Sequence, residues 1–231
     1  MTVSPRRPAS PRAARAYHKG NVAQDLRNAA ERILATERLE DVTIRRLTRE
    51  VGVTPANFYN HYNTLDHLLF DIAADGFDAM HHLAQPIFAR EGARADLLVA
   101  AGLEYIRFCV RNRQLTRLMF RRADGFQYSR YPEAAIRAFG AVIGFIYGDE
   151  AAREANPPAG THDRFGVAFG FFALWYGISL IAAEGLFLLD ADNEAEFNSF
   201  VDHTMRPFIT GSAAEVIARA EAAGRNMPAI S

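Results

Sequence analysis

The chain has 231 residues, of which 49% are hydrophobic and 23% are charged, and its formal net charge at pH 7 is −1. This length and composition allow a buried core in one domain, or in a small domain fused to a larger one. The single cysteine, Cys109, excludes an intrachain disulfide framework and favours a reducing compartment. The N-terminus lacks the continuous apolar stretch of a secretory signal, so we expect a cytoplasmic protein.

The first 19 residues are basic, and no acidic residue precedes Asp25. Their proline and serine content predicts a disordered arm over residues 1–19. A basic arm on a nearly neutral chain is typical of contact with a polyanion, although a solubilising tail has the same composition. The cations of the arm are Arg6, Arg7, Arg12, Arg15 and Lys19.

Apolar spacing is helical almost everywhere, and no sustained alternation of period two occurs, so we predict an all-α chain. The first helix carries an apolar stripe from Val22 to Leu34. A second begins at Thr43, a good N-cap, and ends at Gly52, which is able to adopt a left-handed conformation. Thr54 and Pro55 then start a third, short helix, and Thr64 caps a long fourth one.

Five further helices are expected near residues 96–111, 115–122, 132–148, 162–189 and 194–209. We expect loops over 124–130 and 156–160, and a small terminal helix or tail after Gly211. The predicted domains are an N-terminal three-helix unit over 20–66, a larger helical domain over 67–211, and a terminal segment over 212–231. The boundary therefore falls inside the fourth helix.

Three short helices with a tight turn between the second and third predict a helix-turn-helix unit. Leu47, Val51, Val53 and Phe58 are expected to pack the second and third helices against the first. The third helix would then present its polar side to a DNA major groove about 12 Å wide. The residues expected to reach bases or phosphates are Thr43, Arg45, Thr54, Pro55, Ala56, Asn57, Tyr59, Asn60 and His61.

Residues 43–72 resemble the DNA-binding domain of the tetracycline-repressor (TetR) family. The most specific parts are Gly52-Val53-Thr54, Phe58-Tyr59, His61-Tyr62 and the helix-four opening with Asp66, Leu68 and Leu69. The resemblance covers residues 21–77, about a quarter of the chain. It implies a homodimer that binds double-stranded DNA and a small-molecule effector. It further implies that Thr43 and Tyr59 contact the DNA backbone, and that the other positions named above, apart from Asn60, lie at or near bases.

The sequence departs from the family pattern in two places. Leu65 replaces a lysine that is common at the start of the fourth helix, where it meets a phosphate. Leu39 and Glu40 replace the glycine and the aromatic residue that usually follow the first helix. Losing one phosphate cation should weaken DNA affinity and lower its salt dependence by about one unit.

The C-terminal part resembles one class of the family, defined by a Leu-Met-Phe element and a Trp-His-Gly element. Leu118-Met119-Phe120 matches the first element, whereas Phe172 and Tyr176-Gly177 alter the second. We expect a largely apolar or aromatic effector in this helical bundle. Each candidate residue for the pocket wall could instead be an ordinary core residue. The candidates are Tyr105, Phe108, Cys109, Met119, Phe120, Phe126, Tyr128, Tyr131 and Tyr176.

Dimerisation is expected through two segments, 165–189 and 194–209, because both are too apolar to leave exposed. Two-fold symmetry would place two recognition helices about 34–36 Å apart, on a pseudo-palindromic operator. The uncharged run from Phe165 to Ala183 leaves a membrane-tethered regulator open as an alternative. A third possibility is a helical small-molecule carrier that does not bind DNA.

Two further patterns are weaker. His67, Asp71, Asp75, Asp78 and His82 recur at helical spacing, as metal ligands or, more often, as a solvated stripe. Arg113, Arg117 and Arg121 are expected to form a solvated face. The sequence contains no phosphate-binding loop, dinucleotide fingerprint, Gly-x-Ser-x-Gly or paired-histidine zinc helix, so we expect no enzyme, cofactor or metal site.

Overall fold

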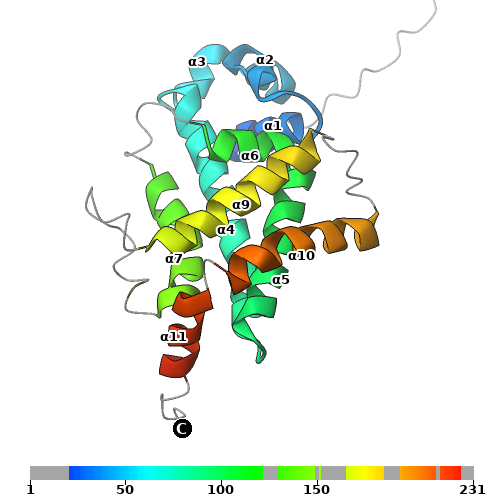
Figure 1. Ribbon diagram of the computed structural model, residues 1–231. Coiled ribbons are helices and arrows are strands. Elements are labelled where there is room, and N and C mark those ends of the chain that lie inside the picture. The colour runs from blue at the N-terminus through cyan, green and yellow to red at the C-terminus, as the bar shows by residue number, and fades with distance from the viewer. Residues whose placement is uncertain are drawn as a thin grey trace, which may run out of the picture.

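A computed structural model describes residues 21–121, 129–148, 151, 165–184, 193–211 and 214–224. In these ranges every regular element is a helix (Figure 1). The predicted all-α fold, with an N-terminal helix-turn-helix unit and a larger C-terminal helical bundle, is confirmed. The predicted loop over 156–160 and most of the one over 124–130 lie outside the described residues.

The N-terminal unit consists of α1 (Val22–Thr36), the short 3-10 helix η1 (Leu39–Asp41), α2 (Ile44–Val51) and α3 (Pro55–Phe58). The helix starts follow the predicted capping chemistry. The hydroxyl oxygens of Thr43 and Thr54 accept hydrogen bonds from Arg46 N and Asn57 N, each at 3.3 Å. Gly52 ends α2 with a φ of 79°, a conformation that favours glycine. The sequence analysis did not predict η1.

The C-terminal bundle begins with the lower part of α4 (Leu65–Phe88), which Thr64 caps as predicted. It continues through α5 (Arg94–Arg111), α6 (Arg113–Met119) and α7 (Tyr131–Tyr147). The chain then forms α9 (Gly166–Ala183), α10 (Glu194–Thr210) and α11 (Ala214–Gly224). α4 runs from the helix-turn-helix end into the middle of the bundle, and α9 and α10 cross α5 on one face of the bundle (Figure 1). The two predicted domains therefore share α4.

Two hydrophobic clusters form the core. The first, which we call the N-terminal cluster, joins α1–α4 to α6 and to the start of α7, and it includes Leu26, Phe58, Phe77 and Met119. The second, the C-terminal cluster, joins α5, α7, α9, α10 and α11 around Trp175. The N-terminal cluster extends well past residue 66, because Met80, Cys109 and Met119 belong to it.

The apolar side of α10 packs inside its own chain. Phe197, Val201 and Met205 are at most 1% exposed, and its solvent side carries polar residues such as Ser199 and His203. The C-terminal cluster therefore buries the apolar stripe of α10 within its own chain, and a part for α10 in a dimer stays a prediction. On α9, by contrast, Phe169 and Leu180 are 44% and 43% exposed.

Candidate nucleic-acid interface and ligand cavity

The α2–α3 unit has a buried base and an exposed tip. Leu47 and Phe58 are fully buried, and Val51 and Val53 are partly buried against the same cluster, as predicted. The backbone N–H groups of Gly52 and Val53 both donate to Thr48 O at 2.9 Å, which closes the turn between the two helices. Thr48 is 2% exposed, and its carbonyl oxygen thereby fixes the turn. The unit therefore presents α3 in one fixed orientation.

Most of the predicted DNA-contacting residues lie on the solvent side of this unit. Tyr59, for example, is 56% exposed, although it follows the fully buried Phe58. Helical periodicity explains the contrast, because Phe58 points into the core and its neighbours do not. The exposed members of the set are Thr43, Arg45, Thr54, Pro55, Ala56, Tyr59, Asn60 and His61.

Asn57 is the exception in this set. It is half-buried, and its Oδ1 is buried without a hydrogen-bond partner among the described residues. An amide that is to pair with adenine needs both its oxygen and its nitrogen exposed. The Asn57 side chain must therefore rotate outward before it can make a two-point contact with a base.

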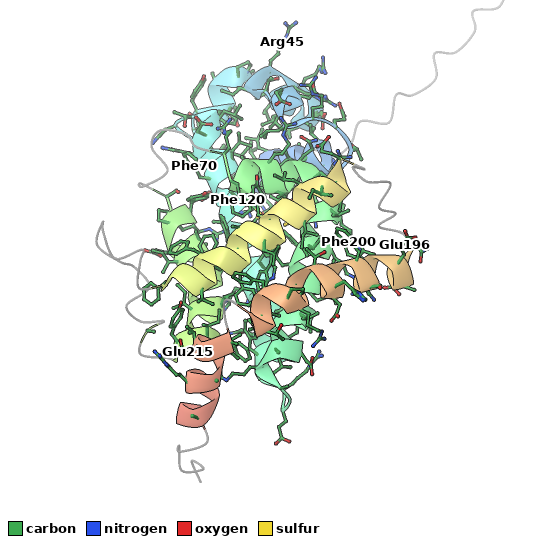
Figure 2. The ribbon with its side chains drawn as sticks, viewed as in Figure 1. Arg45, Phe70, Phe120, Glu196, Phe200 and Glu215 are labelled. Atoms are coloured by element: carbon green, nitrogen blue, oxygen red, sulfur yellow. The ribbon has the colours of Figure 1, made fainter. Side chains whose placement is uncertain are left out.

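The arginines of α2 differ in their partners. Arg46 pairs with Glu37 and, at 3.1 Å, with Glu50, and these carboxylates raise the pKa of its guanidinium. Arg45 and Arg49 are exposed and have no ion pair among the described residues. Arg45 projects from the tip of the molecule (Figure 2). Arg45 and Arg49 are therefore available for phosphates, whereas Arg46 is held by its own chain.

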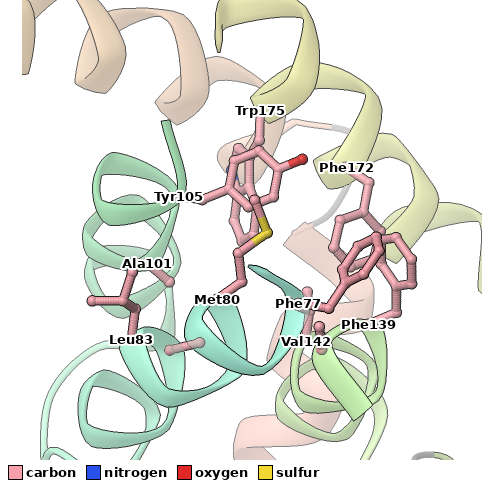
Figure 3. Close-up of a pocket in the computed structure, with 11 residues that line it drawn as sticks. Phe77, Met80, Leu83, Ala101, Tyr105, Phe139, Val142, Phe172 and Trp175 are labelled. Carbon is pink, nitrogen blue, oxygen red and sulfur yellow. The ribbon is translucent and has the colours of Figure 1, made fainter. Parts of the chain in front are cut away.

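A small enclosed cavity of about 30 Å³ lies in the bundle, between α4, α5, α7 and α9 (Figure 3). Tyr105 and Trp175 form one wall, with their ring centroids 5.5 Å apart. Phe139 and Phe172 form another, in an edge-to-face contact at 4.4 Å. The remaining lining is almost wholly apolar and comprises Phe77, Met80, Leu83, Ala84, Ala101, Ala138 and Val142.

The cavity lies where the two hydrophobic clusters meet. Phe77 and Met80 on α4 belong to the N-terminal cluster, whereas Ala101, Val142 and Trp175 belong to the C-terminal one. Its volume holds water but no ring-bearing molecule. A larger guest therefore requires lining side chains or helices to move.

None of the protein-family models or curated proteins compared with the chain matches it. Solved structures do. A Rhodococcus sp. RHA1 protein with unknown function is 23% identical, with a TM-score of 0.62, and the match covers 89% of this chain and 98% of that one. AmtR of Mycobacterium smegmatis, a TetR-family regulator, is 19% identical with a TM-score of 0.50, over 97% of this chain and 100% of that one. The chain has a TetR-like fold.

RolR, solved in complex with resorcinol, is a more distant neighbour, 17% identical with a TM-score of 0.48 over 91% of this chain and 96% of that chain.

In the TetR-like fold of the present chain, Leu65, which departs from the family pattern, is the first residue of α4 and is half-buried. Arg121, two residues after the end of α6, forms an ion pair with Asp66 next to Leu65. A guanidinium from another part of the chain is thus close to the place of the missing lysine.

The structure brings only Tyr105 of the predicted pocket residues to the cavity. Met119 is fully buried, and Phe120 packs on Phe77 and on Tyr176. Tyr131 donates a hydrogen bond from its hydroxyl to Met119 O at 2.5 Å. Phe108 is half-buried against the N-terminal cluster, and Cys109 and Tyr176 line a different pocket. Phe126 and Tyr128 lie outside the described residues.

Sequence reasoning missed most of the actual lining. Phe77, Met80, Phe139 and Phe172 occupy ordinary positions in apolar helical stripes, and such stripes also describe core residues. The only distinguishing signal was the small residues Ala101 and Ala138, which leave the space unfilled. That signal becomes readable only once the facing helices are known.

Two other predicted patterns have a structural role in the TetR-like fold. Asp75 and Asp78 of α4 are ion-paired with arginines, including Arg130 and Arg137. Within the described part of the chain, no group of three potential ligands could hold a metal ion. Arg113 pairs with Glu184 at 3.3 Å, and Arg117 with Glu40 at 3.2 Å. Arg113, Arg117 and Arg121 are all exposed, as predicted, and the ion pairs of Arg113 and Arg117 also join α6 to other elements.

One helix among the described residues, α9, is long and apolar enough to cross a membrane, with a mean hydropathy of 1.8. One third of it is buried inside the bundle. Trp175, Ile178 and Ser179 are among its residues that face the core. A core helix of a water-soluble bundle satisfies the same test, so this feature is weak evidence for a membrane span.

Proposed function

We propose that the chain is a ligand-responsive, DNA-binding transcriptional regulator that acts as a homodimer in the cytoplasm. The observation that carries this proposal is the α2–α3 unit, which holds a row of solvent-facing polar side chains on a fully buried base of Leu47 and Phe58. A helix that only packed in a bundle would not need an exposed tyrosine next to a short helix that begins with a capping threonine and a proline.

The roles within the interface follow from chemistry and position. Arg45 and Arg49, which have no ion pair in the described part of the chain, supply cations for phosphates, and the hydroxyls of Thr43 and Tyr59 suit phosphate oxygens. Pro55 and Ala56 offer apolar contact to a thymine methyl group, while Asn57, Asn60 and His61 supply hydrogen bonds to base edges or phosphates. The basic arm over residues 1–19 would add contacts to the DNA.

Dimerisation is proposed through the face that carries α9. Its exposed positions recur at helical spacing and combine the small Gly166 and Ala173 with the large Phe169 and Leu180. Small residues let two helices approach closely while large ones fill the seam. Because α10 exposes a polar side, it would contribute the polar rim of the interface. The pair of α3 helices would then meet two half-sites of a pseudo-palindromic operator.

The effector is proposed to be a small apolar or aromatic molecule in the cavity at the junction of the two clusters. A ring does not fit the present volume, so we propose that such a molecule displaces Phe77 and Met80 of the lining. Both residues belong to α4, and the N-terminal end of α4 is the next element after α3 in the chain. Effector binding would therefore reorient α3 and release the operator, which makes the protein a repressor with two conformations of different DNA affinity. The Leu-Met-Phe element favours membership of the Trp-His-Gly-type class.

The DNA-binding proposal is tested by titrating the full chain into labelled DNA from upstream of its own gene. We expect sequence-specific binding that competitor DNA does not remove. Asn57→Ala combined with Tyr59→Phe should weaken binding by about 1–4 kcal/mol. Weak, sequence-indifferent binding that ignores both substitutions would instead indicate a carrier without DNA function.

The effector proposal is tested by mass spectrometry of any molecule that co-purifies, and by unfolding scans with a panel of monocyclic aromatics. Ala101→Leu should abolish ligand-induced stabilisation, because the larger side chain fills the cavity. Leu83→Ala, at the exposed edge of the same lining, is the matched variant that enlarges the cavity and should preserve binding. Stabilisation that persists in Ala101→Leu would contradict this location.

A further inference from the structure

A second pocket, of about 310 Å³, lies between η1, α5, α6 and α9. It shares no lining residue with the aromatic cavity. Its volume is at the lower end of the range for small-molecule sites. We refer to it as the arginine pocket. Its lining includes Arg38, Arg113, Arg117, Tyr176, Ala183 and Glu184.

Three guanidiniums, those of Arg38, Arg113 and Arg117, line this pocket. Glu184 faces Arg113 at 3.3 Å, and Glu40, just outside the lining, lies 3.2 Å from Arg117 and 3.4 Å from Arg38. In these ion pairs three arginines face two glutamates, and the Asp41 carboxylate, which accepts a hydrogen bond from Arg38 N at 3.2 Å, lies beside Arg38. The side chains in these pairs are all 51–72% exposed. Such ion pairs are weak and can exchange one carboxylate for another.

The floor of the arginine pocket is buried and uncharged. The Thr116 and Ser179 hydroxyls are buried, and they already donate to the carbonyl oxygens of Cys109 and Trp175, at 3.3 and 2.7 Å. Burial also raises the pKa of the Cys109 thiol, so the floor carries no negative charge at neutral pH. Leu180, Ala183 and the ring of Tyr176 complete an apolar side. Charge is therefore confined to the mouth of the pocket.

We infer that the arginine pocket is a second ligand site, for a small amphiphilic monocarboxylate whose head group the guanidiniums bind and whose apolar body lies against α9. Guanidinium is the donor group that matches a carboxylate in two-point geometry. Three guanidiniums share two glutamates in exposed ion pairs, so a guanidinium can turn to the carboxylate of a bound monoanion. A neutral aromatic molecule would gain nothing from the arginines and belongs in the other cavity.

A ligand in the arginine pocket would contact both halves of the molecule. Arg38 precedes η1 in the helix-turn-helix half, whereas Arg113 and Arg117 belong to α6 in the bundle. The two halves are already linked here, since Leu39 N donates to the side-chain oxygen of Gln114 at 3.0 Å. A carboxylate between Arg38 and α6 would tighten this link. The regulatory meaning of the site, though not the binding itself, rests on the proposed DNA-binding function.

The test is calorimetric titration of the full chain, without DNA, using benzoate as the probe and benzamide as its neutral counterpart. Benzoate should bind at least about ten-fold more tightly than benzamide. Arg113→Gln with Arg117→Gln should weaken benzoate about ten-fold or more and leave benzamide unchanged. Arg219→Gln removes an exposed arginine far along the chain on α11 and should change neither affinity.

A second pair of variants guards against indirect effects of the arginine substitutions. Ala183→Asp places a carboxylate at the apolar side of the pocket and should abolish benzoate binding, while Ala183→Asn, of equal size, should retain it. Equal affinity for benzoate and benzamide, no benzoate binding at millimolar concentration, or insensitivity to Ala183→Asp would overturn the inference. Because no DNA is present, its failure is distinguishable from failure of the DNA-binding proposal.

Discussion

Asp75 of α4 forms an ion pair with Arg27 of α1, and the same carboxylate also pairs with Arg130 at the start of α7. Arg130 reaches Asp78 as well, at 2.9 Å. One carboxylate thus connects the helix-turn-helix half to the bundle across the helix that both share. The α4 shift that we propose for effector entry would change the distance from Asp75 to both arginines.

Asp75→Asn should therefore affect signal transfer more than stability. The carboxylate is 46% exposed, so the free energy of unfolding should fall by about 1 kcal/mol or less. The ratio of operator affinities with and without effector should change several-fold, because the neutral amide no longer holds both arginines. Anisotropy titrations measure this ratio. Glu215→Gln, which breaks an exposed pair on α11, should leave it unchanged, and equal ratios in all three proteins would contradict the coupling role.

Arg45 and Arg46 are adjacent in sequence but should respond differently to removal. Arg45→Ala deletes an exposed cation at the tip, so operator affinity should fall and the slope of log affinity against log salt should shrink by about one unit. Arg46→Ala deletes a cation that Glu37 and Glu50 already neutralise, so its salt slope should stay close to that of the unmodified chain. Gel-shift series at several salt concentrations measure both slopes. Equal losses of slope would show that Arg46 leaves its partners on DNA.

The helix-turn-helix half was predictable because its signals are local. Thr43 and Thr54 cap their helices, and Gly52 takes the left-handed turn, through atoms only a few residues apart. The Phe58–Tyr59 contrast of buried and exposed rings likewise follows from helical period alone. The side chain of Asn57 was less predictable, since the inward turn of its Oδ1 depends on packing rather than on sequence spacing.

The cavity was much less predictable because it depends on residues that are far apart in the sequence. The small side chains of Ala101 on α5 and Ala138 on α7 leave a space, and Phe77 and Phe172 from two other helices border it. Tyr105 was identified, but Phe120 and Tyr131 were equally aromatic and form packed core contacts instead. Apolar stripes specify which side of a helix is buried and leave open which buried side chains border a void.

Gly102 of α5 allows α9 and α10 to approach closely. A methyl group at this position would lie 2.5 Å from Met205 Cε and 2.6 Å from Trp175 Nε1. Gly102→Ala should therefore destabilise the chain by about 1–3 kcal/mol, despite the better helix propensity of alanine. Chemical denaturation measures the loss.

The clash predicts non-additivity with Met205. Met205→Ala alone opens a cavity in the core and should cost about 2–5 kcal/mol. In the double variant, however, the methyl group introduced by Gly102→Ala no longer meets the Met205 side chain, so the combined loss should be smaller than the sum by about 0.5 kcal/mol or more. Additive losses would show that the backbone, rather than Met205, absorbs the methyl group.

Alkaline pH should destabilise the fold. Burial is the largest cause of the raised pKa of Tyr62, Tyr105 and Tyr131, so each keeps its proton in the folded state to a higher pH than in the unfolded chain. Above the ordinary tyrosine pKa of about 10, the unfolded chain therefore binds fewer protons, and the free energy of unfolding falls as pH rises. Urea titrations at about pH 8 and about pH 10.5 measure the slope. Tyr105→Phe should flatten it, whereas Tyr59→Phe, which alters an exposed ring, should not.

Cys109 should react slowly with thiol reagents despite lining the arginine pocket. It is 2% exposed, and burial raises the pKa of its thiol, although hydrogen bonds with Ser179, Thr116 and Tyr105 oppose this effect. The thiolate is the reactive form, so at about pH 8 the folded chain should be labelled by a disulfide reagent at least about 100-fold more slowly than the urea-unfolded chain. Labelling of the native chain as fast as that of the unfolded chain would mean that α6 and α9 separate readily, and that the thiol is not held in a buried site.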